Sequence, residues 1–231
     1  MAILIKISIK NQRLTITDNK MEYDLLERAS SLATSKAEMN ALLKTWLSLG
    51  KKDIPDQKEY LELLEKGIQL NNESDNVNQF RQKVKQLKNH QVIKSYPIST
   101  ALKGIGQNKN SFQTPIGLHY IRAKIGKGLP VLSIFEGRRP TGKIWNKDDA
   151  KLDPDHDWIL SRILWLSGRE LGVNRLGSSD TMQRYIYIHG TPNESQLGKP
   201  LSHGCIRMSN NDVIELFDLV SAGTIVHINE E

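Results

Sequence analysis

The chain of 231 residues contains one cysteine and no long hydrophobic run. A single thiol cannot form an intramolecular disulfide, so we expect no disulfide cross-link to stabilise the fold. No stretch approaches the ~20 apolar residues that a transmembrane helix requires. The apolar start after Met1 is too short for the core of a signal peptide. We therefore expect a cytoplasmic protein without a membrane span, or a periplasmic one if an export leader has been removed.

The sequence also lacks a run of lysines and arginines. Its net charge is +6, but residues 20–90 carry 12 basic and 11 acidic side chains, so most of the excess lies elsewhere. Nucleic-acid modules usually concentrate basic residues, often with aromatic ones, and neither pattern is present. The charge therefore favours an anionic substrate, and we expect no nucleic-acid partner.

Hydrophobic periodicity divides the chain into two kinds of segment. Residues 3–17 alternate apolar and polar side chains around a break, which predicts a β-hairpin. Residues 20–89 have four apolar stripes at helical spacing with short connections, which predicts a small helical bundle. We expect an α+β protein whose catalytic domain comprises residues 1–19 and 90–231, with 20–89 as an inserted all-α subdomain. The insertion contains no titratable constellation, so its expected role is structural or partner-binding.

The region after residue 90 reads as short strands separated by Gly- and Pro-rich loops. A final helix is expected to start at the N-cap Ser209, with Asp212 three positions later, and to stop before Gly223. The predicted strands cover residues 91–99, 131–135, 158–166, 184–188 and 224–228.

The most informative feature is the single cysteine, Cys205, which follows His189 by 16 positions. Most free cysteines are small buried hydrophobes, but this one lies among polar residues and glycine. A thiolate nucleophile needs a base or a positive field. His189 is the favoured base, because it ends a predicted strand and Gly190 leaves its ring uncrowded. His203 is only two positions from the thiol, and its ring is expected to point away.

The neighbours of the cysteine suggest how a reaction would be supported. Gly204 allows close approach of a substrate, and the N–H groups of Gly204 and Cys205 are candidates for an oxyanion hole. Arg207 is placed to stabilise a thiolate or to hold a substrate carboxylate. These residues predict acyl transfer through a thioester. A zinc site made by His189, His203 and Cys205 is the rival interpretation, although the spacing matches no zinc signature.

Two segments together resemble a known family. His189-Gly190-Thr191-Pro192 followed by Ser202-His203-Gly204-Cys205-Ile206-Arg207-Met208 resembles the signature of the L,D-transpeptidase catalytic domain, also called the YkuD domain. Residues 111–117 resemble the T-P-x-G entry to a strand of that family, and the opening hairpin is similar as well. The resemblance covers roughly two-thirds of the chain and implies a β-sandwich-like domain of mixed sheets.

The resemblance implies both a reaction and roles for individual residues. In the family, a cysteine attacks the L-centre carbonyl of the third residue of a peptidoglycan stem peptide and expels the terminal D-Ala. Cys205 would be the nucleophile, and His189 the base, oriented by the carbonyl of Gly190. The family resemblance places Ser202, His203 and Gly204 on the oxyanion side and makes Arg207 the arginine of the pocket. No cofactor and no metal are implied.

Two departures from the family pattern leave alternatives open. The chain more closely resembles short members without an export signal, which are associated with trimming of recycled tetrapeptides, so water is an alternative acceptor and L,D-carboxypeptidase an alternative activity. Arg138, Arg139 and Arg162 are candidates for substrate contact or for structural ion pairs. The insertion at 20–89 interrupts the family pattern and is a candidate for binding a protein partner. A non-catalytic peptidoglycan-binding protein is the last alternative.

Overall fold

A computed structural model of the chain describes residues 3–17, 92–153 and 156–230, and the predicted helical insertion lies outside this part. Strands and helices follow in the order β1 (Leu4–Ser8), β2 (Arg13–Thr17), β3 (Val92–Pro97), β4 (Gly117–Ile125), β5 (Ser133–Glu136), β6 (Arg139–Ile144), α5 (Lys147–Leu152), β7 (Ile159–Gly168), β8 (Tyr187–Gly190), β9 (Ile206–Met208), α6 (Asn210–Leu219) and β10 (Ile225–Asn229), with 3-10 turns at Gly177–Ser179 and Glu194–Gln196.

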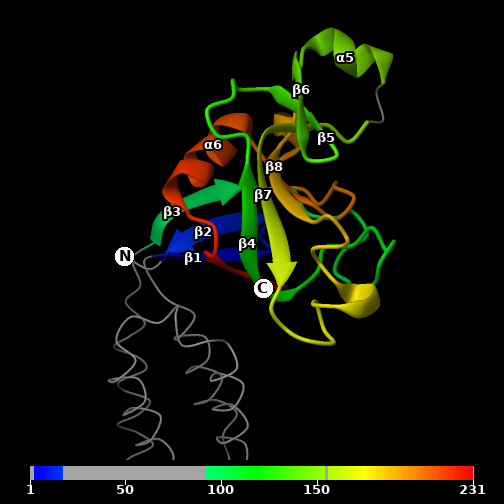
Figure 1. The fold of residues 1–231 in the computed structure, drawn as a ribbon, viewed down its shortest axis with the longest axis vertical. Helices are drawn as coiled ribbons and strands as arrows, with labels where there is room; N and C mark the ends of the chain where they lie inside the picture. The colour runs from blue at the N-terminus through cyan, green and yellow to red at the C-terminus, as the bar shows by residue number, and fades with distance from the viewer. Residues whose placement is uncertain (1–2, 18–91, 154–155, 231) are drawn as a thin grey trace, which may run out of the picture. The chain divides into compact units, whose positions relative to one another are not determined.

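The described strands join into one mixed sheet, shown in Figure 1. Its order is β3-β2-β1-β10-β4-β7-β5-β6, and β8 pairs with β7 and with β9. The β8–β9 pair is parallel, whereas β7 pairs antiparallel with β4, β5 and β8. The described part is thus mostly β-sheet with few helices, which confirms the β-rich core of the predicted fold class.

Most of the opening hairpin, residues 5–16, belongs to the same compact unit as the C-terminal part of the chain. Residues Ile5–Ile16 and Ile93–Glu231 cluster together by their contacts. Successive side chains of a strand point to opposite faces, and the alternate apolar positions of the two strands are buried. These are Ile5 and Ile7 in β1 and Leu14 and Ile16 in β2, and Leu4, which precedes Ile5, is buried as well.

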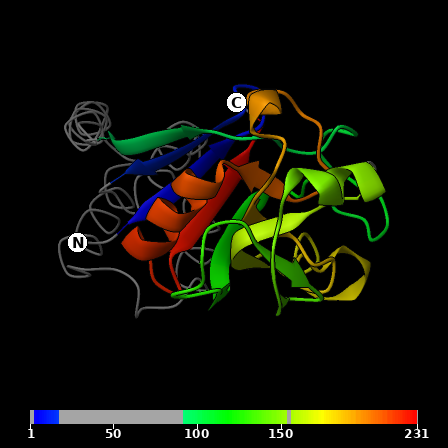
Figure 2. The ribbon, with the colours of Figure 1, turned by 90° about the horizontal axis from the view of Figure 1, so that it is seen from above.

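Helix α6 starts as the sequence predicts. The Ser209 side chain accepts a hydrogen bond from the backbone N–H of Asp212 at 3.1 Å, which satisfies one of the free donors of the first turn. Val213, Leu216 and Phe217 form its buried face, and the helix lies over one face of the sheet, where it contacts β7 and β8 (Figure 2). Helix α6 therefore covers one face of β7 and β8, and the side chains of the candidate site lie on the other face.

Strand β8 begins later than the sequence predicts. The predicted strand covered residues 184–188, whereas β8 runs from Tyr187 to Gly190. Tyr185 has a left-handed backbone conformation with φ of 58°, which bends the chain out of the strand. The Arg184 guanidinium donates to the backbone carbonyls of Gly106 and Gln113, so it fastens the turn to a neighbouring loop.

Candidate active site

Strands β8 and β9 place the predicted nucleophile and base on one face of the sheet. The two strands run parallel, with His189 in register with Arg207, and Cys205 immediately precedes β9. Side chains alternate along a strand, so Tyr187 and His189 share a face, and the residues opposite them share it too. The partly buried Cys205 packs against the buried cluster of Phe135, Ile163 and Tyr187.

The thiol of Cys205 is held by the chain that precedes β8. It accepts a hydrogen bond from the backbone N–H of Tyr187 at 3.4 Å and donates to the carbonyl of Tyr185 at 3.5 Å. Burial and the negative charge of Asp157 raise the pKa of Cys205 to about 12, against the opposing effect of the Tyr187 N–H and of Arg207. The free site therefore holds a thiol rather than a thiolate, and attack requires a base.

His189 is the candidate for that base. Its ring is fully buried, and its Nδ1 lies 2.9 Å from the carbonyl oxygen of Gly190. A carbonyl only accepts hydrogen bonds, so Nδ1 carries the proton and the lone pair is on Nε2. Nε2 is buried without a hydrogen-bond partner in the described structure. Burial lowers the pKa of His189, opposed by Asp157 and by the bond to Gly190, so the ring is neutral near pH 7.

Gly190 orients the base through its close packing. A Cβ atom at this position would come within 2.5 Å of Asn210 Oδ1 and 2.8 Å of the Leu160 carbonyl oxygen. Any other residue would push apart the end of β8, the start of α6 and β7. The glycine therefore fixes the carbonyl that selects the tautomer of His189.

Ser202 and Gly204 shape the loop before the thiol. The Ser202 hydroxyl accepts from the Gly204 N–H at 3.2 Å and donates to the Cys205 carbonyl at 2.6 Å. The backbone of Gly204 has φ of 131°, which other residues rarely adopt. The Gly204 N–H, one of the two predicted oxyanion donors, is therefore already bonded inside the loop. The Cys205 N–H is the donor that remains from the predicted pair.

Thr114, from the segment that resembles the T-P-x-G entry, is hydrogen-bonded to this loop. Its hydroxyl accepts from the Ala101 N–H at 3.0 Å and donates to the Gly204 carbonyl at 3.0 Å. The residue is fully buried. One side chain thus connects the entry to β4 with the loop that carries Cys205.

Arg207 is bound to a carboxylate that sequence reasoning missed. Its guanidinium donates to Asp157 Oδ1 at 2.6 Å and to the Leu201 carbonyl at 3.1 Å. His203 Nδ1 lies 3.1 Å from Asp157 Oδ2, so its ring is directed at this carboxylate. Burial would raise the pKa of Asp157, but electrostatic interaction with the His189 ring and with the Arg207 guanidinium, together with the hydrogen bonds from His203 and Arg207, holds that pKa below its usual value.

The structure separates the two arginines of the β5–β6 turn. Arg138 donates to the Tyr187 hydroxyl at 3.1 Å, and its guanidinium carbon lies 4.6 Å from the Tyr185 ring centroid and 4.9 Å from that of Trp165. This places Arg138 beside residues 185–187, the thiol-binding segment, whose backbone holds the Cys205 sulfur. Arg139 is exposed and lies opposite Glu136 in the hairpin.

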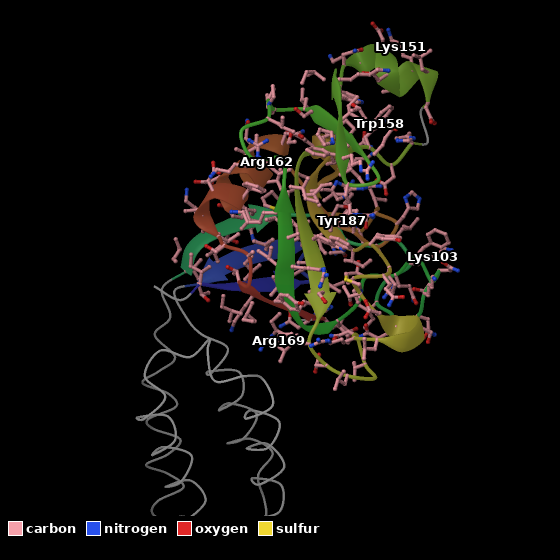
Figure 3. The ribbon with its side chains drawn as sticks, viewed as in Figure 1. Lys103, Lys151, Trp158, Arg162, Arg169 and Tyr187 are labelled. Carbon is pink, nitrogen blue, oxygen red and sulfur yellow. The ribbon has the colours of Figure 1, made fainter. Side chains whose placement is uncertain are left out.

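Arg162 is held by backbone carbonyls, which favours the structural role over substrate contact among the two alternatives for this residue. Its guanidinium donates to the carbonyls of Leu129 and Ser161 at 2.9 and 2.7 Å. It also lies 5.5 Å from the ring centroid of Phe217 in α6. In Figure 3 Arg162 lies beside α6, away from Tyr187. Neighbouring residues of a strand point to opposite faces. The next residue, Ile163, belongs to the cluster that packs against Cys205, so the Arg162 side chain faces the side covered by α6.

A cavity of about 190 Å³ opens next to the thiol-binding segment. The Phe112 and His203 rings meet edge to face at 6.3 Å between centroids, and the ammonium of Lys103 lies 4.8 Å from the Phe112 centroid. The walls are formed by Lys109, Asn110, Phe112, Gln183, Arg184, Tyr185, Ile186 and His203.

The rival zinc interpretation finds no support in the placement of its proposed ligands. In the part of the chain that the structure describes, no group of three or more His, Cys, Asp or Glu side chains is placed to hold a metal ion. His203 is directed at Asp157 instead.

Among the described helices, none has the length and apolar character needed to cross a bilayer.

Asp157, Arg184 and Tyr187 are the site residues that the sequence did not reveal. Asp157 lies 32 positions before His189 and belongs to no recognised motif. An acidic residue beside Trp158 gives no periodicity signal that would bring it to Arg207. Only the path of the chain between β6 and β7 places it there.

Comparison with known proteins points to one family. The profile of the L,D-transpeptidase catalytic domain, YkuD, matches residues 76–228. The putative L,D-transpeptidase YkuD of Bacillus subtilis (strain 168) is 60% identical over 47 residues, which are 20% of this chain and 29% of that protein. The putative L,D-transpeptidase YqjB of the same organism is 39% identical over 66 residues, covering 29% of this chain and 36% of that protein.

The matched segments thus span little more than a third of the curated relatives at most. Among solved structures, L,D-transpeptidase 3 from Mycobacterium tuberculosis aligns with 99% of this chain and 61% of its own, with 14% identity and a TM-score of 0.42. A score at this level adds no weight to the assignment, which rests on the family profile.

Proposed function

The chain belongs to the YkuD family of L,D-transpeptidase catalytic domains, and we propose that it transfers acyl groups of peptidoglycan stem tetrapeptides through a thioester on Cys205. The bond cleaved is the L,D bond before the terminal D-Ala. The observation that carries the proposal is the buried, unpartnered Nε2 of His189, which shares a sheet face with the only thiol of the chain. A buried imidazole with one fixed and one free nitrogen is suited to move a proton.

In the first half-reaction, His189 Nε2 takes the proton of the Cys205 thiol as the sulfur attacks the L-centre carbonyl. Because the thiol pKa is raised to about 12, proton transfer and attack are coupled rather than preceded by a stable ion pair. The carbonyl oxygen becomes an oxyanion, to which we assign the Cys205 N–H as donor, because the Gly204 N–H is bonded to Ser202. Collapse breaks the C–N bond, and His189 returns the proton to the departing D-Ala amine.

In the second half-reaction, an acceptor resolves the thioester. His189 removes a proton from the acceptor, the acceptor forms a bond to the acyl carbon, and the C–S bond breaks to regenerate the Cys205 thiol. A side-chain amine of a neighbouring stem gives a cross-link, and a D-amino acid gives an exchanged stem. Water gives a tripeptide, which is the L,D-carboxypeptidase alternative. All three use the same two residues.

The test is incubation of the protein with a disaccharide tetrapeptide, followed by mass spectrometry of the products. Tripeptide, dimer and exchanged tetrapeptide report water, stem amine and added D-amino acid respectively as acceptors. We expect turnover in the wild type and none above background in Cys205→Ala, with a loss of about 10²–10⁴-fold in His189→Gln. Binding of the peptide without any of these products would favour the non-catalytic alternative.

A carbapenem gives an independent readout of the thioester chemistry. The resemblance implies that the family's thiol is acylated by this class, so the wild type should gain the mass of one carbapenem. Cys205→Ala should gain none. An adduct that persists in the variant would place the acylation elsewhere and contradict the mechanism.

The predicted insertion at 20–89, its partner, the sandwich layering and the cytoplasmic location remain predictions from the sequence. Replacing residues 20–89 by a short linker and measuring turnover of free tetrapeptide and of intact peptidoglycan tests the first two. We propose that the insertion recruits a partner, which predicts unchanged turnover of the free peptide and loss on the larger substrate. Cell fractionation tests the location.

A further inference from the structure

Asp157 is engaged on both carboxylate oxygens by residues that flank the nucleophile. Oδ1 accepts from the Arg207 guanidinium at 2.6 Å, and Oδ2 lies 3.1 Å from His203 Nδ1. His203 and Arg207 lie two positions before and two positions after Cys205. One side chain on each side of the thiol, an imidazole and a guanidinium, thus points to the same carboxylate.

Exposure increases outward through this cluster. The side chain of Arg207 is 9% exposed, that of Asp157 30% and that of His203 59%. Arg207 Nε is buried without a hydrogen-bond partner in the described structure. The guanidinium therefore lies beneath Asp157, and a carboxylate arriving from solvent must replace Asp157 to pair with it.

The cluster is close enough to the reacting groups to affect them. Arg207 is in register with His189, and the charge of Asp157 acts on both His189 and Cys205. A second negative charge beside Asp157 would be repelled, whereas a negative charge in its place would keep Arg207 paired. Exchange of one carboxylate for another avoids leaving a buried charge alone, which is strongly unfavourable.

We propose that Asp157 is an internal carboxylate that occupies an anion-binding site formed by Arg207 and His203, and that a carboxylate of the substrate replaces it there. The identity of that carboxylate rests on the proposed function, where the terminal D-Ala supplies one next to the scissile bond. The anion site itself rests only on the geometry. Asp157 is thereby a selectivity-determining residue, since a substrate without a free carboxylate cannot take its place.

Alkylation of the only thiol tests the anion site without any peptidoglycan substrate. Iodoacetamide and iodoacetate differ in charge and attack the same sulfur. We expect the ratio of iodoacetate to iodoacetamide rates, followed by intact mass at pH 7, to rise about tenfold in Asp157→Ala, because a free cationic site concentrates anions. Asp157→Asn keeps the shape of the side chain and should show the same direction of change.

Two further variants show whether the effect belongs to the anion site. Asp153→Ala removes a nearby carboxylate of the same segment, which pairs with His156 at 3.2 Å, and should retain the wild-type ratio. Adding Arg207→Gln to Asp157→Ala should return the ratio to the wild-type value. An unchanged ratio in both folded Asp157 variants, or a rise that survives the loss of Arg207, would overturn the proposal.

A stability measurement provides a second readout. Acetate should occupy the vacated site of Asp157→Ala and raise its melting temperature by about 2–4 °C relative to chloride at equal ionic strength. Wild type and Asp153→Ala should show no such difference, and no shift in folded Asp157→Ala would contradict the site. If acetate binds but no tetrapeptide is turned over, the proposed function fails and the anion site stands. If tetrapeptide is turned over but neither the alkylation ratio nor the melting temperature responds as expected, the anion site fails and the proposed function stands.

Discussion

Thr114 and Gly204, which are 90 positions apart, are joined by a hydrogen bond of 3.0 Å from the threonine hydroxyl to the glycine carbonyl. The same hydroxyl accepts from the backbone N–H of Ala101. Both bonds are buried, so the loop that carries Cys205 is held at one end by a side chain from the entry to β4. The position of the thiol therefore depends on a fully buried residue from another segment of the chain.

Thr114→Val tests this support. The change keeps the shape but removes both hydrogen bonds and leaves a buried N–H and carbonyl unpaired, which costs about 1–3 kcal/mol for each such group. We expect a lower free energy of unfolding in urea and a several-fold slower alkylation or acylation of Cys205. Thr114→Ser retains the hydroxyl and should recover most of the rate. Equal rates in the valine and serine variants would show that the hydroxyl does not position the loop.

Much of the site could be predicted from the sequence because its parts are local. Cys205, His189 and the N-cap Ser209 lie in short segments whose residue types indicate a thiol site, a base and a helix start. Gly190 directly follows the histidine. The structure places Nδ1 of His189 against the Gly190 carbonyl, as the resemblance implied. These features depend on neighbours in the chain.

The remaining features depend on contacts between distant segments, which composition and periodicity do not encode. Arg162 and Arg138 look alike in sequence, but β7 directs the first toward Phe217 and the β5–β6 turn brings the second to Tyr187. The pairing of Asp157 with Arg207 joins residues 50 positions apart. The start of β8 was misplaced because the left-handed backbone of Tyr185 is not visible in an apolar alternating run.

Arg138 and Arg139 form a matched pair for a test of substrate contact. Arg138 is stacked near Trp165 and Tyr185 and bonded to Tyr187, whereas Arg139 is exposed. We expect Arg138→Met to raise KM for the tetrapeptide by about tenfold, the loss of one charge-assisted contact, with a smaller effect on kcat. Arg139→Met should leave both constants within about twofold. Steady-state kinetics check this, and equal effects of the two changes would remove Arg138 from the substrate site.

Arg162 should act on stability rather than on binding. Arg162→Met keeps the packing on Phe217 but removes the bonds to the Leu129 and Ser161 carbonyls. We expect unfolding to require about 1–3 kcal/mol less free energy, measured by urea titration, with KM for the tetrapeptide unchanged. A tenfold rise in KM without loss of stability would return Arg162 to the substrate-contact residues.

The raised pKa of Cys205 predicts an unusual pH profile of alkylation. Burial and Asp157 raise that pKa to about 12, and the thiolate fraction grows about tenfold per pH unit below the pKa. The iodoacetamide rate of the free protein should therefore still be rising at about pH 10, where an ordinary cysteine with a pKa of about 8.5 has levelled off. The urea-unfolded protein is the control and should level off normally. A plateau of the folded protein near pH 8.5 would contradict the raised pKa of the thiol.

Buried neutral histidines should make the fold sensitive to acid. His119 in β4 is fully buried, with Nδ1 3.0 Å from the Gly117 carbonyl and Nε2 3.1 Å from the Thr181 hydroxyl. Burial lowers its pKa from 6.5 to about 4, opposed by the bond to Gly117 and assisted by the charge of His227. Burial also lowers the pKa of His189.

The sign of the effect follows from where the proton binds first. Between pH 6.5 and about 4 the unfolded chain binds a proton at position 119 and the folded protein does not, so stability falls as pH falls through this window. The shift corresponds to about 3 kcal/mol by pH 4. His119→Gln should be less stable at pH 7.5 but show a smaller loss in urea titrations between pH 7.5 and 4.5. His156→Gln, which changes an exposed histidine, should keep the wild-type slope, and an unaltered slope in His119→Gln would show that this histidine is not the acid-sensitive group.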